Sequence, residues 1–323
     1  MDLIFMKPNR EDEGVLHAYT FDLAFGKDEN DFECKIAENN HCCDEDFILY
    51  IENTEYGGII DSIGADTAAK DVTYYGRTWH GVLNSKVLEP DSGANYLVLS
   101  GEANSVLATL INRMGLNSLF KASDEVSGIN ISNYQMNRYI KGYDGIRKML
   151  KAFGAKLNMV FSEGFVVLSA KPIIDYSRDE QFDKDQIDFV VKKNNNVLNH
   201  VIGLGQGELS EREVIHVYAD ASGNISETQV FTGLEEVTDT YDNNSAESSE
   251  ELYKGCVEML ETAWHSDELD FSFNSDDECF DIDDIVGATE SVTGIEIRAE
   301  ITKKIVQMND NTTTISYEVG ERI

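Results

Sequence analysis

Alternating hydrophobic and polar positions dominate the first hundred residues of the chain. Segments 46–52 and 71–75 are rich in β-branched and aromatic residues, and clusters of Gly, Asn and Asp separate them. Residues 1–8 form another short apolar run, and Gly57-Gly58 precedes Ile59-Ile60 as at a tight turn. Because a period of two is typical of half-buried strands, this region predicts antiparallel strands arranged as a barrel or sandwich.

The pattern takes the period of helices after residue 100. In segments 104–115 and 143–153, apolar residues recur every three or four positions, and a glycine lies at or just beyond the end of each segment. Segment 155–170 then alternates on both sides of Ser162-Glu-Gly164, which predicts a β-hairpin. We therefore expect residues 101–195 to form a compact α+β unit inserted between β-rich regions.

The last third of the sequence combines strands with one long helix. Strand patterns cover 196–205 and 213–218, and a helix is predicted from 248 to 264 with Leu252, Cys256, Met259, Leu260 and Ala263 on its apolar face. The final strand candidates are 281–288, 294–301, 304–308 and 313–319, with a turn at Asn309-Asp310-Asn311 between the last two.

Charge narrows the possible partners. The 323 residues carry a net charge of -34, and the window from Glu235 to Asp284 holds 18 acidic residues against one basic residue. Nucleic-acid binding requires clustered Lys and Arg, so sequence-specific binding is not expected. No apolar stretch approaches the ~20 residues of a membrane span, so membrane insertion is not expected either. The acidic window is interpreted as a solvated surface, with a channel lining or a face for a basic partner as the alternative.

Two groups of residues suggest metal ligands. Cys34, His41, Cys42 and Cys43 lie close in sequence, but a second ligand pair at zinc spacing is missing, so ordinary free thiols are favoured for all five cysteines, including Cys256 and Cys279. The runs 276–278 and 281–284 are acidic enough to attract Ca²⁺, yet they lack the ligand order of an EF-hand. No metal or other cofactor is predicted.

Catalytic motifs are also missing from the sequence. The run Gly203-Leu-Gly205-Gln-Gly207 lacks the Lys-Ser/Thr of a phosphate loop, and a strand ending in a glycine turn is the better interpretation. His200 and His216 lie inside predicted strands and are expected to be partly buried and hydrogen bonded. We predict that the protein is not an enzyme, and no catalytic, cofactor-binding or metal-binding residue is assigned.

Several segments in the same order resemble the baseplate hub or tail-tip proteins of long, noncontractile-tailed phages and prophages of Gram-positive bacteria, also called tail-associated or tail endopeptidase-like proteins. The segments that carry the resemblance are 75–83 with Glu89-Pro90, 143–150 with 154–157, 167–170 with 174–177, 199–209, 214–220 with 223–226, 280–288, and 301–306 with 317–320. Two departures from the family pattern are Asp283, where a Gly is usual, and an end at Ile323, where many members continue into fibres or a peptidoglycan hydrolase.

The resemblance implies a β-rich α+β fold with two β-barrel domains and an inserted α+β domain, similar to the baseplate hubs of contractile phages. The expected domains are a first β-barrel over 1–100, completed by strands within 196–240, the inserted domain over 101–195, and a helix with a second β-barrel over 241–323. It also implies a structural protein that forms a homotrimeric ring.

The implied place is the tail tip of the virion, after synthesis in the cytoplasm of the bacterial host. Implied partners are distal-tail or tail-tube proteins, the tape-measure protein and host-facing tip proteins. Two alternatives stay open: a tail-tip cell-wall hydrolase, and a carbohydrate-binding receptor module. The receptor module would require Tyr74, Tyr75 and Trp79 to be exposed, whereas a large aromatic residue such as Trp79 more often lies in a core.

Overall fold

The computed structural model describes residues 2–178, 197–221, 223–246, 248–265, 272–275, 280–289 and 296–322. The chain forms two compact units. Unit 1 comprises Met1–Phe189, Ser272–Thr289 and Glu296–Gly320, and unit 2 comprises Val190–Phe271 with the short segments 290–295 and 321–323. Unit 2 is therefore an insertion in the sequence of unit 1.

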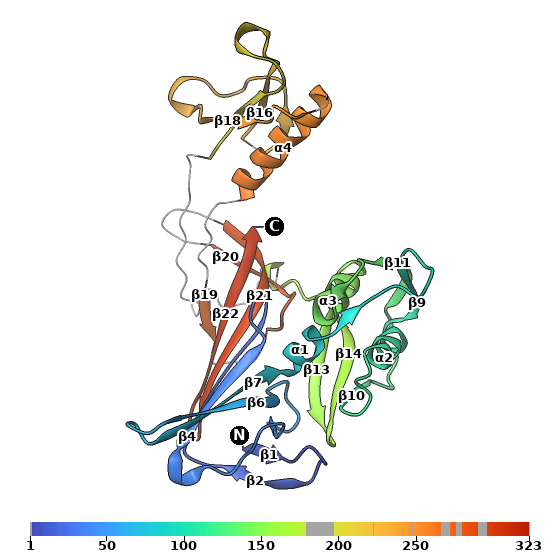
Figure 1. Cartoon of the computed structure of the whole chain (residues 1–323), viewed down its shortest axis with the longest axis vertical. Helices are drawn as coiled ribbons and strands as arrows, with labels where there is room; N and C mark the ends of the chain where they lie inside the picture. The colour runs from blue at the N-terminus through green and yellow to red at the C-terminus, as the bar shows by residue number, and fades with distance from the viewer. Residues whose placement is uncertain are drawn as a thin grey trace. The chain divides into compact units, whose positions relative to one another are not determined.

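An eleven-stranded sheet forms the β-rich part of unit 1 (Figure 1). Its strands are β1 (Leu3–Met6), β2 (Asp12–Leu16), β3 (Tyr19–Gly26), β4 (Asp31–Ala37), β5 (Ile48–Tyr50), β6 (Gly57–Asp66), β7 (Asp71–Thr78), β19 (Ser272–Ser275), β20 (Ile285–Thr289), β21 (Glu296–Asn309) and β22 (Thr313–Arg322). The order is β19-β22-β21-β3-β4-β7-β6-β5-β1-β2, with β20 paired to β21. The direction of the strands changes strongly along this sheet (Figure 1).

The sheet differs from the predicted barrels. In the described residues its ladder is an open path from β19 to β2, so a closed barrel is not formed there. Strands within 196–240 do not complete the first β region as expected. Instead β21 pairs with β3, with Val306 opposite Leu23 and Met308 opposite Phe21. These four side chains are buried, so apolar packing between strands far apart in sequence determines the pairing.

The glycines at 57 and 58 do not make the predicted turn, because both lie inside β6 and pair with β5. A Cβ at Gly57 would lie 2.6 Å from the ring of Trp79, and one at Gly58 would lie 2.7 Å from the ring of Phe32. These positions lack side chains because aromatic rings pack directly against the strand backbone.

The α+β part of unit 1 follows β7. It contains α1 (Trp79–Asn84), β8 (Val87–Leu88), β9 (Leu97–Glu102), α2 (Ala103–Arg113), β10 (Phe120–Ala122), β11 (Asn130–Met136), β12 (Ile140–Lys141), α3 (Gly142–Lys151), β13 (Ala155–Ser162) and β14 (Phe165–Pro172). Its core is shared with the large sheet, because Met6, Ile48 and Tyr50 of the sheet belong to the same buried cluster as Trp79, Leu107, Ile146 and Phe161.

The predicted helices and hairpin of this part are confirmed. In α2, Val106, Leu107, Leu110 and Ile111 are buried, and the chain leaves the helix at Gly115 with a positive φ of 71°. The β13–β14 hairpin has Ser162 opposite Phe165, and Glu163 and Gly164 both have positive φ, as a two-residue turn of type I′ requires.

Unit 2 is built from a four-stranded sheet and one helix. Its elements are β15 (His200–Leu204), β16 (Val214–Ala219), β17 (Ile225–Ser226), β18 (Thr238–Asp242) and α4 (Ser249–His265), with sheet order β17-β16-β15-β18. Val201, Val217 and Ala219 of the sheet form a buried cluster with Cys256 and Leu260 of the helix. Because α4 covers the apolar face of these strands, they do not need the first β region as a partner.

Short 3₁₀ turns lie at Glu38–Asn40, Tyr176–Arg178, Leu209–Glu211 and Gly233–Glu235. The predicted strands at 294–301 and 304–308 belong to one strand, β21, and the predicted turn at 309–311 connects it to β22. The predicted strand at 281–288 begins only at Ile285.

Among the described helices, none has the length and apolarity to cross a membrane.

Candidate functional site

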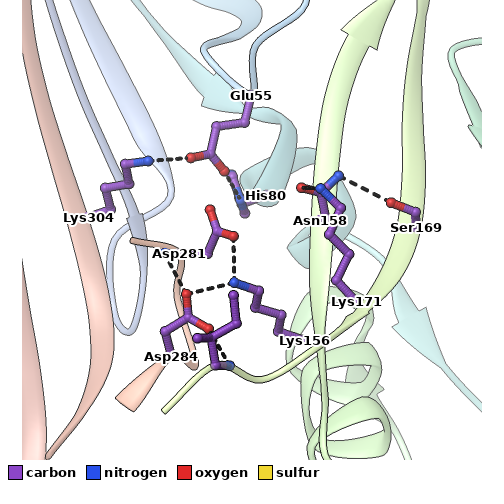
Figure 2. A network of polar contacts seen from close by, with 10 residues as sticks. Glu55, His80, Lys156, Asn158, Ser169, Lys171, Asp281, Asp284 and Lys304 are labelled. Carbon is purple, nitrogen blue, oxygen red and sulfur yellow. Dashed lines mark hydrogen bonds and ion pairs between the residues drawn. The ribbon is translucent and has the colours of Figure 1, made fainter. Parts of the chain in front are cut away.

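A buried lysine of β13 joins the α+β part of unit 1 to the segment that precedes β20. The Lys156 side chain is 2% exposed, and its Nζ lies 2.6 Å from Oδ2 of Asp281 and 2.6 Å from Oδ2 of Asp284. Figure 2 shows both carboxylates pointing toward this nitrogen. A buried ammonium is tolerated when charged and hydrogen-bonding partners surround it, so the two carboxylates compensate its desolvation.

The backbone also fixes Asp284. Its second oxygen, Oδ1, accepts a hydrogen bond from the Ile174 N–H at 2.9 Å, and Oδ2 accepts one from the Asp281 N–H at 3.0 Å. Burial raises the pKa of Asp284, while the bonds from Lys156 and the backbone lower it. Burial is the larger effect, so the pKa of Asp284 stays above its ordinary value, and the bonds from Lys156 and the backbone offset part of that rise.

A second ion pair stands beside the first. Arg147 of α3 donates to Asp283 through Nε at 3.1 Å and through Nη2 at 2.5 Å, and the Asp283 side chain is only 3% exposed. Asp283 has a φ of 75°, a left-handed conformation that favours glycine. Asp283 takes this backbone conformation, and its side chain provides a partner for Arg147.

A third pair and a histidine complete the cluster. Lys304 of β21 donates to Oε1 of Glu55 at 2.8 Å, and both residues line a polar pocket of about 150 Å³ together with His80 and Arg147. Burial together with the nearby Arg147 and Lys304 charges lowers the pKa of His80 well below its ordinary value of 6.5. The His80 ring is therefore neutral, and it stacks on Phe25 with centroids 4.3 Å apart.

We call Glu55, His80, Arg147, Lys156, Asp281, Asp283, Asp284 and Lys304 the ion-pair cluster. Each of its three cations, Arg147, Lys156 and Lys304, has a carboxylate partner, and among the described residues Thr54 is the one Ser, Thr or Cys that lines the pocket. Thr54 Oγ1 donates to the Ile51 carbonyl and accepts from the Tyr56 N–H, so it is part of a turn. The cluster fastens the 281–284 segment to α3 and β13 of the α+β part, and it ties β21 to the loop between β5 and β6.

The predicted calcium candidates are partly engaged in this cluster. Asp281, Asp283 and Asp284 bind Lys156 and Arg147, and residues 276–278 lie outside the described residues. In the part of the chain that the structure describes, no group of three or more His, Cys, Asp or Glu side chains is arranged to hold a metal ion.

The cysteine group behaves as predicted for free thiols. Cys34, Cys42, Cys43 and Cys256 are unpaired, and Cys279 lies outside the described residues. Burial raises the pKa of the Cys34 thiol to about 12, which makes it a poor metal ligand and a poor nucleophile. The Tyr74 hydroxyl is 2.9 Å from Nδ1 of His41, so this histidine has a hydrogen-bonding partner other than a metal.

The two strand histidines were expected to be partly buried and hydrogen bonded; both are hydrogen bonded, but His216 is exposed. His200 is buried, and its two ring nitrogens lie 2.7 Å from Glu236 Oε1 and 2.8 Å from Nδ1 of His216. The Gly203–Gly207 run ends β15 and continues into a turn, with a φ of 99° at Gly207. A Cβ at Gly203 would lie 2.6 Å from Sγ of Cys256, so this glycine lets α4 approach the sheet.

The sequence analysis did not find the ion-pair cluster, because its members come from six separate elements or loops. A signal was present: segment 138–156 holds six basic residues and one acidic residue in a chain with a net charge of -34. Such a segment needs acidic partners, and the acidic run at 281–284 supplies them.

Comparison of this chain with known proteins finds solved structures of a similar fold. No protein-family model matches the sequence, and no curated protein sequence matches it. Among solved structures, the chain is similar to the 43 kDa tail protein of prophage MuSo2 from Shewanella oneidensis, with a TM-score of 0.52, 8% identity, and coverage of 98% of this chain and 97% of that chain.

Two further solved structures match at lower TM-scores. They are the prophage tail protein gp18 from Listeria monocytogenes EGD-e (TM-score 0.47, 12% identity, 98% of this chain and 94% of that chain) and a tail protein from Neisseria meningitidis MC58 (TM-score 0.47, 12% identity, 99% and 96%). At these identities, the likeness to the MuSo2 protein shows that the two chains share a fold.

Proposed function

We propose that this chain is a structural tail protein of a phage or prophage. The observation that carries the proposal is the fold shared with the MuSo2 tail protein over 98% of this chain and 97% of that chain. The ion-pair cluster is consistent with this role, because its buried ion pairs stabilise a scaffold.

The proposed position is the baseplate hub at the tail tip. There the chain forms a homotrimeric ring that joins the tail tube or distal-tail ring to host-facing tip proteins and contacts the tape-measure protein. The segments that resemble tail-hub proteins support this position, and so does the β-rich scaffold of unit 1, whose sheet brings β3 and β21 together from opposite ends of the sequence.

The acidic window from Glu235 to Asp284 has a proposed place in the ring as well. Carboxylates that face the lumen repel the phosphates of DNA, so the genome passes without binding to the wall. The described helix α4 contributes Glu250, Glu251, Glu258 and Glu261 to this window.

The experiment that tests the hub is a mass measurement by light scattering on a sizing column over a range of protein concentrations, followed by negative-stain imaging. A species near three times the 36.1 kDa chain mass, seen as a ring, is the expected result. Particles of that mass without a central opening contradict the ring.

The enzyme and receptor alternatives have less support. Trp79 and Tyr74 are each 0% exposed, so of the three aromatic residues that a sugar-binding face would use, only Tyr75 is exposed. A zymogram on host peptidoglycan, with and without added Zn²⁺, tests the hydrolase directly. Clearing of the gel at the position of this protein would overturn the structural proposal.

A further inference from the structure

Part of the basic segment 138–156 is not used in the ion-pair cluster. Arg147, Lys151 and Lys156 pair with Asp283, Glu300 and the carboxylates at 281 and 284. The three remaining cations are exposed and have no ion-pair partner among the described residues: Arg138, Lys141 and Lys148.

Apolar side chains accompany these unpaired cations at the surface. In the short ladder of β8 and β12, Lys141 lies opposite Val87, which places both side chains on the same face. Val87 is 53% exposed and Tyr139 is 61% exposed, and the guanidinium of Arg138 lies 5.5 Å from the Tyr139 ring centre. We call Val87, Arg138, Tyr139 and Lys141 the basic face.

A groove of opposite charge lies on the outer side of the large sheet. It crosses β21, β3, β4 and β7, has a volume of about 350 Å³, and is lined by the apolar side chains of Tyr75, Ile305 and Ala24. Its charged residues are Asp22, Asp31 and Glu33, and no ion pair involves them in the described part of the chain. We call these six residues the acidic groove.

The carboxylates of the acidic groove are unfavourably placed in a single chain. Asp22 lies directly opposite Glu33 in the β3–β4 ladder, and like charges at such positions destabilise a sheet. Burial raises the pKa of both Asp22 and Asp31. Cations on the same strands are already engaged: Arg77, which lies opposite Asp31 in the β4–β7 ladder, pairs with Asp61, Lys35 pairs with Asp71, and Lys303 pairs with Glu29 and Glu318.

We propose that the basic face of one copy of this chain docks in the acidic groove of a second copy. The two surfaces share no residue, so the contact is heterologous, and a heterologous contact generates a ring when its rotation closes. This inference rests on the proposed homotrimeric hub and identifies the residues that hold its copies together.

Charge complementarity favours a second copy as the occupant. Two chains of net charge -34 repel each other at long range, so a stable contact between them needs local charges of opposite sign. The basic face provides cations beside apolar side chains, and the acidic groove provides partly desolvated carboxylates beside Tyr75 and Ile305. Each surface thus matches the other in both charge and apolarity.

The test reverses each surface separately and then both together in the full chain. Arg138→Glu with Lys141→Glu reverses the basic face, and Asp22→Lys with Glu33→Lys reverses the acidic groove. Each pair is expected to raise the dissociation constant of self-association by about tenfold or more, and the fourfold variant to restore it to within about threefold of the wild type. Sedimentation in one buffer of fixed NaCl concentration measures the constants of all variants, so that screening by salt is the same in each.

Each matched control reverses two charges, as the surface variants do, but at exposed positions outside both surfaces. Glu38→Lys with Glu45→Lys is the control for the groove, and Lys27→Glu with Lys254→Glu is the control for the basic face. Circular dichroism and thermal unfolding check that every variant is folded. The controls are expected to associate as the wild type does.

The outcomes separate this inference from the proposed function. Rings that form normally in both reversed variants overturn the docking inference and leave the hub intact. A second outcome also overturns the docking inference: the groove variant alone loses association, and the fourfold variant does not restore it. The groove would then bind another protein. A wild-type chain that forms no ring contradicts the proposed trimer itself.

Discussion

Asp283 shows at the scale of one residue how much of the site was visible in the sequence. The sequence analysis marked position 283, and its φ of 75° is a left-handed conformation that favours glycine. The partner of its side chain could not be predicted, because Arg147 lies 136 positions away and comes close only when β13 and α3 pack in unit 1. Sequence pattern thus identified the backbone requirement and missed the ion pair.

The Lys156 ion pair should contribute strongly to the stability of unit 1. Lys156→Met leaves Asp284, whose side chain is 0% exposed, without its cation, and such a loss costs about 3–5 kcal/mol in free energy of unfolding. Adding Asp284→Leu removes the unpaired charge, so the double variant is expected to recover most of that loss. Urea unfolding of the three proteins measures the difference.

Lys35→Met is the matched control, since the Lys35 side chain is 47% exposed in its pair with Asp71. Its expected cost is much smaller than that of Lys156→Met, because solvent screens an exposed ion pair. Equal costs for Lys35→Met and Lys156→Met contradict the importance of burial in the cluster.

His80 should make the stability of unit 1 depend on pH. Burial and the nearby Arg147 and Lys304 hold its folded pKa well below 6.5, so below pH 6.5 the unfolded chain binds a proton that the folded chain does not. Stability therefore falls as the pH drops from 6.5 toward the folded pKa, by about 1.4 kcal/mol per pH unit.

His80→Phe removes the titration and keeps a ring that can stack on Phe25. Many carboxylates also titrate, so the informative quantity is the difference between wild type and variant. From pH 7.5 to pH 5.5, the wild type should lose about 1.4 kcal/mol more than His80→Phe. Urea unfolding measures the free energy of unfolding of both proteins at the two pH values. If both lose the same amount, the proposal of a neutral buried His80 is refuted.

At the scale of elements, local periodicity predicted helices and hairpins better than strand partners. The helices α2, α3 and α4 and the hairpin at 162–165 follow from patterns within a few turns of chain. The pairing of β21 with β3 depends on contacts between residues more than 270 positions apart, which periodicity does not report.

One strand was predicted as two for a local reason. Ala299 and Ile301 are buried at odd-numbered positions of β21, whereas Lys304, Val306 and Met308 are buried at even-numbered positions. The change of parity interrupts the alternation although the backbone stays extended. Buried Lys304 hides the pattern further, because a lysine is interpreted as an exposed position unless its partner Glu55 is known.

The glycine positions of β6 should differ in their tolerance of a methyl group. In Gly57→Ala the new Cβ would lie 2.6 Å from both the Trp79 ring and the Leu49 carbonyl oxygen, so the strand or the ring must move. Overpacking of this kind costs about 1–3 kcal/mol. In Gly64→Ala the nearest atom is 3.2 Å away on exposed Tyr75, so a change within about 0.5 kcal/mol is expected.

Thermal unfolding of the two alanine variants at one protein concentration compares these positions. A lower midpoint for Gly57→Ala with an unchanged midpoint for Gly64→Ala is the expected pattern. If Gly57→Ala unfolds at the wild-type temperature, the close packing of Trp79 on β6 does not limit the sequence at this position.

At the scale of the whole molecule, two buried clusters of the described residues, one in each unit, differ greatly in size. The cluster shared by the large sheet and the α+β part of unit 1 has 28 buried residues, whereas the cluster of unit 2 has five. A small core supplies little stability to a domain, so unit 1 carries most of the apolar stabilisation of the described residues. The ion-pair cluster also belongs entirely to unit 1.

Removal of residues 197–265, with a flexible Gly-Ser linker in their place, should therefore leave unit 1 folded. All strands of the large sheet and all members of the ion-pair cluster remain in the shortened chain. We expect its main urea transition to keep a free energy of unfolding within about 1 kcal/mol of the wild type, and the Lys156→Met effect to persist in it. Loss of the cooperative transition would mean that unit 2 is required for the fold of unit 1, and that the small cluster around Cys256 and Leu260 stabilises more than its own sheet.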